Sequence, residues 1–61
     1  SGLMLATTLA PVIGYEKAAK IAKKAHKSGQ TVLETSLELT DLSEEELIEI
    51  LNPEKMVKPS D

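Results

Sequence analysis

Apolar side chains recur along this chain in four segments, each with helical spacing. The first segment, residues 3–9, is apolar almost all round its axis, because it carries Leu3, Met4, Leu5 and Leu9. Pro11 should end this helix at or before Ala10, since the residue before a proline is disfavoured in the helical region. No capping residue marks its start, so we interpret residues 1–10 as the end of a helix from an upstream domain. A short amphipathic helix packed on the domain's own core is the alternative.

The clearest helical pattern spans residues 15–28. Its stripe follows spacings of three and four residues, with Ala19 and Ile21 beside it, and consists of Tyr15, Ala18, Ala22 and Ala25. An acid lies in the first turn and basic side chains crowd the last turn, and both placements suit the helix dipole. Gly29 follows at the position where a helix commonly ends with a left-handed residue.

Two capping boxes predict the starts of two further helices. Thr31 is followed three residues later by Glu34, so a hydroxyl and a carboxylate can each accept from an N–H of the first turn. Ser43 and Glu46 repeat this arrangement, with Leu42 and Leu47 placed as a hydrophobic staple. The side chains predicted to face inward are Val32, Leu33 and Leu37 in the third helix, and Leu47, Ile48 and Leu51 in the fourth. Asn52 and Pro53 should stop the fourth helix.

These segments predict an all-α fold, a small bundle of about four short helices. The only β-branched cluster, at residues 11–14, is bracketed by helix and strand breakers, so no strand competes. We expect residues 11–58 to form the helical domain and residues 59–61 to be a frayed tail. A chain of 61 residues is one domain at most, and without cysteine it has no disulfide to stabilise it.

Composition and charge narrow the classes of function. The net charge of −3 argues against nucleic acid as a partner, because phosphate binding needs a basic face unopposed by acids. No apolar run reaches the roughly 18–20 residues that span a bilayer, and the opening residues lack the basic flank of a signal peptide. We therefore expect no membrane partner and a soluble, cytoplasmic protein.

Few side chains are candidates for chemistry. His26 is the only imidazole, and its helix neighbours include no carboxylate to orient it, so we expect it to face solvent, with a contact to another domain as the alternative. A carboxylate metal site could be imagined at Glu44, Glu45 and Glu46, but acids in a first turn are expected from the helix dipole alone. Tyr15 is interpreted as structural. We predict no catalytic, cofactor-binding or metal-binding residue, and no cofactor.

Basic side chains line one face of the second helix, at the spacing of Lys17, Lys20, Lys24 and Lys27. Such a face can bind phosphate or an acidic membrane. However, eight of the ten acidic residues lie in the next two helices and the segment after them. We therefore interpret the lysines as a solvated face whose field is partly cancelled within the domain.

A resemblance to a known family rests on several motifs. Residues 13–27 read IGYEKAAKIAKKAHK, with LML at residues 3–5, LSEEEL at residues 42–47 and NPEKM at residues 52–56. This pattern resembles the C-terminal domain of class II fumarate hydratases (fumarases), within the fumarase/aspartase superfamily, and it covers nearly the whole chain. The AHK at residues 25–27 favours fumarase over aspartate ammonia-lyase, which stays open as the alternative parent.

The resemblance implies a three-domain parent enzyme that forms a homotetramer through a central helical bundle. Such an enzyme reversibly hydrates fumarate to malate, a reaction of the tricarboxylic acid cycle. In this family the catalytic serine lies on a GSSxMP-type loop and the acid/base histidine in another domain, and neither motif occurs in this sequence. The resemblance thus implies a non-catalytic domain whose partners are the N-terminal and central domains of its own chain.

A stand-alone helical module is the remaining hypothesis, of a different class. It would bind a partner protein through the alanine and leucine stripes. In both cases the apolar first segment has no bundle to cover it in the isolated chain, so we expect weak self-association.

Overall fold

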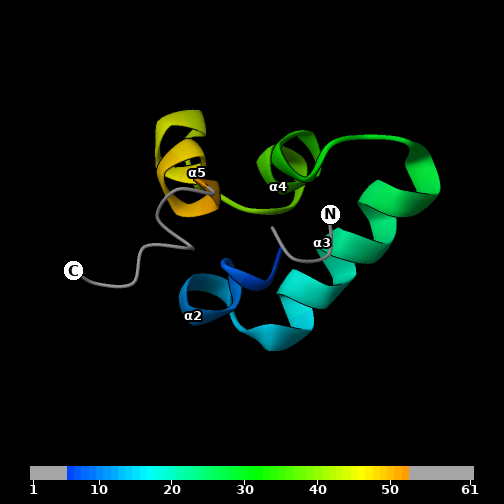
Figure 1. The fold of residues 1–61 in the computed structure, drawn as a ribbon, viewed down its shortest axis with the longest axis horizontal. Coiled ribbons are helices and arrows are strands. Elements are labelled where there is room, and N and C mark those ends of the chain that lie inside the picture. Colours follow the sequence, from blue (N-terminus) through cyan, green and yellow to red (C-terminus); the bar gives the residue numbers. More distant parts are fainter. Residues whose placement is uncertain (1–5, 53–61) are drawn as a thin grey trace.

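The computed structural model describes residues 6–52 of the chain. Residues 6 and 7 are helical, and a turn follows at residues 8 and 9. Four helices come next (Figure 1): α2 (Ala10–Ile13), α3 (Tyr15–Ser28), α4 (Val32–Leu39) and α5 (Glu44–Leu51). No strand occurs within residues 6–52, and the all-α prediction is confirmed.

The short helix α2 was not expected from the sequence, which indicated only that Pro11 would prevent the first helix from continuing. Pro11 instead lies in the first turn of α2, where the amide hydrogen that proline lacks has no helical partner anyway. Gly14 ends α2 by donating its N–H to the carbonyl oxygen of Ala10 at 2.8 Å. Its φ of 93° and ψ of 151° belong to a region that only glycine adopts readily. A glycine is therefore required where the chain turns from α2 into α3.

Helix α3 has the predicted bounds and the predicted end. Gly29 adopts a left-handed conformation, with φ 78° and ψ 7°, and donates its N–H to the Ala25 carbonyl oxygen at 3.0 Å. The predicted stripe was partly wrong, because Ala18, Ile21 and Ala25 are buried whereas Tyr15 is 77% exposed. Ile21, which was predicted only to flank the stripe, is thus part of the buried face, and Tyr15 lies at the surface.

Both predicted capping boxes are present. In the first, Glu34 N donates to Thr31 Oγ1 and Thr31 N donates to Glu34 Oε1, each at 2.9 Å. In the second, Glu46 N donates to Ser43 Oγ at 3.1 Å and Ser43 N donates to Glu46 Oε1 at 2.8 Å. Helix α5 ends at Leu51 with Asn52 as its cap residue, as predicted.

The inward faces of α4 and α5 were predicted only in part. Val32 and Leu47 are buried as expected, but Leu37 is 42% exposed and Ile48 is 54% exposed. On α4 the fully buried positions are instead Thr35 and Ser36, three and four residues after Val32. The three buried positions thus follow the helical period along one side of α4, although two of the residues there are polar.

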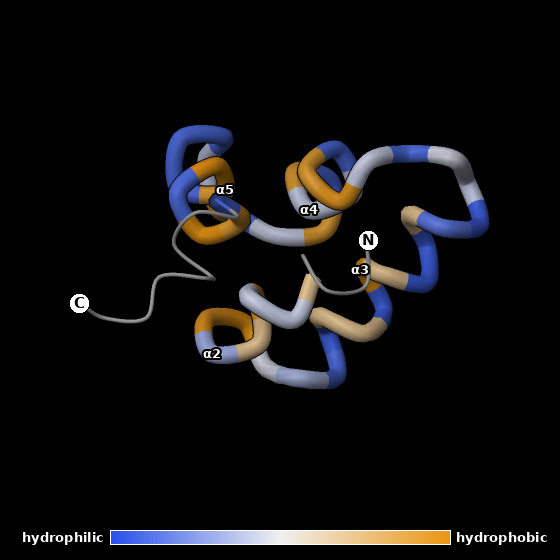
Figure 2. Tube along the Cα trace, in the orientation of Figure 1, coloured by the Kyte–Doolittle hydropathy of each residue, from blue (hydrophilic) through white to orange (hydrophobic). Residues whose placement is uncertain are grey.

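The core joins the start of the chain to all three longer helices. Its buried members are Ala6, Leu9, Ala18, Ile21, Ala25, Val32 and Leu47. Helix α3 packs against α2 and α4, and α4 packs against α5. Helix α4 therefore lies between α3 and α5 (Figure 1). Hydrophobic and hydrophilic residues alternate along α3 in Figure 2, as expected of a helix with one buried face.

Two residues of the predicted first segment belong to this core. Ala6 and Leu9 are buried within the domain, so Leu9 is covered without any further chain. Leu3, Met4 and Leu5 lie outside the described residues, as do residues 53–61. The proposed boundary between an upstream helix and the domain, at residue 10, stays a prediction.

Candidate functional site

The candidate chemical residues do not gather in one place. His26 is exposed in the last turn of α3, as predicted, while Glu44 and Glu45 are exposed in the first turn of α5. The Glu46 carboxylate accepts from Ser43 N in the capping box. Within residues 6–52, no three His, Cys, Asp or Glu side chains are grouped so that they could hold a metal ion. In the same part of the chain, no helix has the length and apolar character needed to cross a membrane.

The lysine face of α3 is connected to α4 by an ion pair. Lys24 Nζ lies 2.8 Å from Glu38 Oε1, and Gln30 Nε2 donates to Glu38 Oε2 at 2.8 Å. The pKa of Glu38 is lowered from its ordinary value. The largest cause is the hydrogen bond from Lys24, followed by the hydrogen bond from Gln30 and by the charge of Lys24. The contact confirms that part of the positive field of α3 is cancelled inside the domain. Lys17, Lys20 and Lys27 are exposed.

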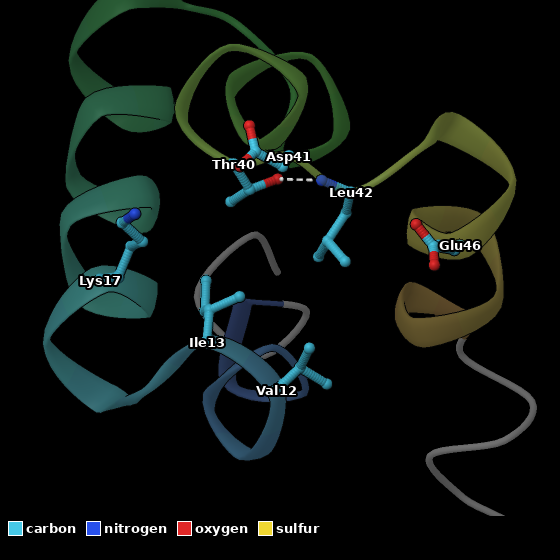
Figure 3. Close-up of a pocket in the computed structure, with 7 residues that line it drawn as sticks. All are labelled: Val12, Ile13, Lys17, Thr40, Asp41, Leu42 and Glu46. Carbon is cyan, nitrogen blue, oxygen red and sulfur yellow. Dashed lines mark hydrogen bonds between the residues drawn. The ribbon is translucent and has the colours of Figure 1, made fainter.

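A first surface groove lies between α2, α3 and the α4–α5 connection (Figure 3), with a volume of about 420 Å³. Its lining is mixed, with apolar side chains from α2 facing Leu42 and with charges at the rim: Val12, Ile13, Lys17, Thr40, Asp41, Leu42 and Glu46. The Thr40 hydroxyl donates to the Ser36 carbonyl oxygen at 2.7 Å and accepts from Leu42 N at 3.2 Å. Because it bonds to the backbone on both sides, this hydroxyl serves the turn between α4 and α5.

A second groove, of about 240 Å³, lies between the first described residues and α3. Alanine methyl groups and one tyrosine form nearly all of its lining: Ala6, Thr7, Ala10, Tyr15, Ala18, Ala19 and Ala22. None of these side chains is charged. The alanine stripe of α3 was visible in the sequence, but the sequence did not indicate that Ala6 and Ala10 form the opposite wall.

One buried hydroxyl was also missed from the sequence. Ser36 is fully buried on α4, and its Oγ has no hydrogen-bond partner in the described part of the chain. Its neighbour Thr35, also fully buried, donates from Oγ1 to the Thr31 carbonyl oxygen at 3.0 Å. Only the tertiary structure distinguishes the two positions, since serine and threonine are both common on helix surfaces.

These observations define a class of protein: a small helical packing domain whose hydroxyls and carboxylates cap helices, and whose surface carries two open grooves. The chain belongs to the family described as Fumarase C C-terminus, whose model matches residues 5–58. The match therefore includes all of the described residues, 6–52.

Individual relatives agree with this assignment. The chain is 58% identical over 59 residues to a class II fumarate hydratase of Bacillus subtilis, covering 97% of this chain and 13% of that protein. It is 59% identical over 58 residues to a class II fumarate hydratase of Rickettsia bellii, covering 95% of this chain and 12% of that protein. With the mitochondrial fumarate hydratase 1 of Arabidopsis thaliana, identity is 54% over 59 residues, covering 97% and 12%.

A solved structure has the same fold. It is described as a fumarate lyase:delta crystallin from Brucella melitensis bound to cobalt, and its TM-score is 0.85 at 46% identity. The similarity covers 93% of this chain and 12% of that one. The chain thus spans about 13% of the length of the curated relatives that it matches, and it corresponds to the C-terminal part of a larger fumarase chain.

Proposed function

We propose that this chain is the non-catalytic C-terminal domain of a class II fumarase whose parent enzyme reversibly hydrates fumarate to malate. The observation that carries the proposal is the 58% identity, over nearly the whole chain, to a class II fumarate hydratase of which it spans 13%. Its direct partners are the other domains of its own chain.

The placement of the polar side chains supports a non-catalytic role. Acid–base catalysis needs a group held at a substrate by an orienting partner, whereas His26 is exposed at the end of α3. The Thr40 hydroxyl is engaged by backbone atoms on both sides. His26 is thus a surface side chain, and the Thr40 hydroxyl stabilises the turn after α4. The family resemblance implies that the serine loop and the acid/base histidine lie in other domains of the parent.

The wider setting of the parent is part of the same proposal. We place it in the cytoplasm, as a homotetramer built on a central helical bundle and acting in the tricarboxylic acid cycle. The net charge of −3 and the lack of a base-stacking aromatic on the lysine face support the proposal that nucleic acid is not a partner.

The full-length parent provides the test. Its sequence upstream of this domain should contain a GSSxMP-type loop, and the purified enzyme should convert fumarate to malate. Assays with L-aspartate on the same preparation distinguish the alternative, because an aspartate ammonia-lyase would release ammonia and leave malate formation at background. A parent with neither activity and no such loop would favour the stand-alone interaction module.

A further inference from the structure

The second groove has a lining that suits a packed helix; we call it the alanine groove and define it by Ala6, Ala10, Tyr15, Ala18, Ala19 and Ala22. We propose that the alanine groove is the surface through which this domain docks onto an uncharged, apolar helix of the remainder of its own parent chain. This inference rests on the proposed function in one respect, namely that the domain is part of a longer fumarase-type chain.

The groove is formed by two elements, which makes it more than a stripe of small residues on one helix. Ala6 is the first described residue and Ala10 is the first residue of α2, whereas the alanines opposite them come from α3. Ala18 is buried and forms the floor, Ala22 is partly buried, and Ala19 is exposed. Since an alanine side chain ends at its methyl group, another helix can approach to the shorter end of the usual packing distance of about 8–10 Å.

The rim of the groove adds an aromatic anchor. Tyr15 is 77% exposed, which leaves most of its ring in contact with water in the isolated domain. Tyrosine combines a large apolar surface with one hydroxyl, and for this reason it is enriched where protein surfaces meet. Its ring can cover the side of an incoming helix while the hydroxyl donates to a backbone carbonyl of that helix.

The charges of α3 favour an uncharged occupant. At about 100° per residue, Lys17, Lys20, Lys24 and Lys27 fall on the side of the helix away from Ala22. That face is exposed, and one of its lysines already pairs with α4 through Glu38. The alanine groove has no charged lining residue, so charge attraction does not select the occupant, and apolar burial does.

The length of chain outside this domain indicates that this helix comes from the rest of the same chain. This chain spans 13% of its Bacillus subtilis relative, so most of a parent of that length lies elsewhere. A surface of the same chain is present at a high effective concentration, which favours it over a free peptide or a second copy of the domain. The groove therefore accounts for how a domain with a small core is held on a much larger enzyme.

Cysteine labelling tests the docking directly, because this chain contains no cysteine of its own. Ala19→Cys places a thiol in the alanine groove, and Lys20→Cys places one at the next exposed position, outside it. Each variant is made in the isolated 61-residue chain and in the full-length parent, and a maleimide is followed by mass spectrometry of the labelled peptide. Circular dichroism of the isolated variants confirms that their helix content is unchanged.

Both thiols should react at similar rates in the isolated chain. In the parent, Cys at position 19 should react at least about tenfold more slowly, because only the undocked fraction is accessible, while Cys at position 20 should keep its rate. Equal rates at position 19 in parent and isolated chain would overturn the proposal. Protection in the isolated chain that grows with its concentration would also overturn it, by identifying a second copy as the occupant. Labelling does not depend on the reaction catalysed, so a protected position 19 in a parent without fumarase activity would refute the proposed function alone.

Discussion

The end of helix α3 depends on one residue in a left-handed conformation, Gly29. A Cβ added there would meet nothing within 4 Å, so a substitution is costly through the backbone alone. We expect Gly29→Ala to lower the free energy of unfolding by about 1 kcal/mol, measured by urea denaturation. Gly29→Asn should lose less, since asparagine tolerates the left-handed region better than alanine does. An alanine variant as stable as the original chain would mean that Gly29 does not end the helix in this way.

A second residue-scale test concerns the buried hydroxyl of Ser36. Because its Oγ has no partner among the described residues, removing it eliminates a desolvated polar group. Ser36→Ala should therefore leave the free energy of unfolding unchanged or raise it by up to about 1 kcal/mol. The matched variant Thr35→Val removes a hydroxyl that does donate to a carbonyl, and should lower it by about 1 kcal/mol. A clear loss of stability in Ser36→Ala would show that this hydroxyl has a partner.

At the scale of the elements, the starts of α4 and α5 depend on their capping boxes. Thr31→Ala and Ser43→Ala each remove a hydroxyl that accepts from an N–H of the first turn. We expect each variant to lose about 1 kcal/mol of unfolding free energy in thermal or urea melts. Glycine at either position should cost only a few tenths of that amount, because it caps helices almost as well. Variants with the stability of the original chain would contradict the capping role.

The contact between α3 and α4 predicts a dependence on pH. The pKa of Glu38 is lowered in the folded chain from an ordinary value of 4.5, mainly by the hydrogen bonds from Lys24 and Gln30. The folded state therefore binds fewer protons than the unfolded state does. The stabilisation that Glu38 gives the folded state is present above about pH 4.5 and is lost as the pH falls through the folded pKa.

The comparison that isolates this effect is between the original chain and Glu38→Gln. The difference in their unfolding free energies should be largest near neutral pH, should shrink below pH 4.5, and should fall in high salt because the pair is half exposed. Lys24→Met should remove the same pH-dependent part. A difference that stays constant from pH 7 to pH 3 would show that the ion pair does not contribute.

Local signals predicted the ends of the elements well. Gly29 and the residues of the two capping boxes act through bonds within a few residues, so their effect is visible in the sequence. The inward faces were predicted less well, because a helix of two turns has too few apolar positions to define a single side. Leu37 and Ile48 are apolar but exposed, and Ser36 is polar but buried, since packing against neighbouring helices sets the rotation.

The short helix α2 and the grooves illustrate what requires the whole structure. Proline is a helix breaker in an interior but acceptable in a first turn, and only the turn at residues 8 and 9 distinguishes these cases. The alanine groove joins Ala6 to Ala22, which come together through packing and share no local motif. The prediction that no residue here is catalytic, made from the side chains and from the family resemblance, stays a prediction.

On the scale of the whole molecule, self-association of the isolated chain stays a prediction. Leu9 is buried in the core, so the prediction now rests on Leu3, Met4 and Leu5, which lie outside the described residues. A symmetric dimer burying about 800–1,200 Å² in total would be weak and would dissociate on dilution. Sedimentation over about a hundredfold range of concentration should detect the dimer, and Leu5→Glu should raise the monomer fraction. A strict monomer at the highest concentration would contradict it.

We propose that this chain is part of a fumarase and performs no chemistry by itself. Loss of fumarate, followed by its ultraviolet absorbance, tests both parts in one measurement on the full-length parent and on the isolated chain at the same molar concentration. We expect turnover by the parent and a trace indistinguishable from buffer for the isolated chain. Turnover by the isolated chain above buffer, or a folded parent that leaves fumarate untouched, would contradict it.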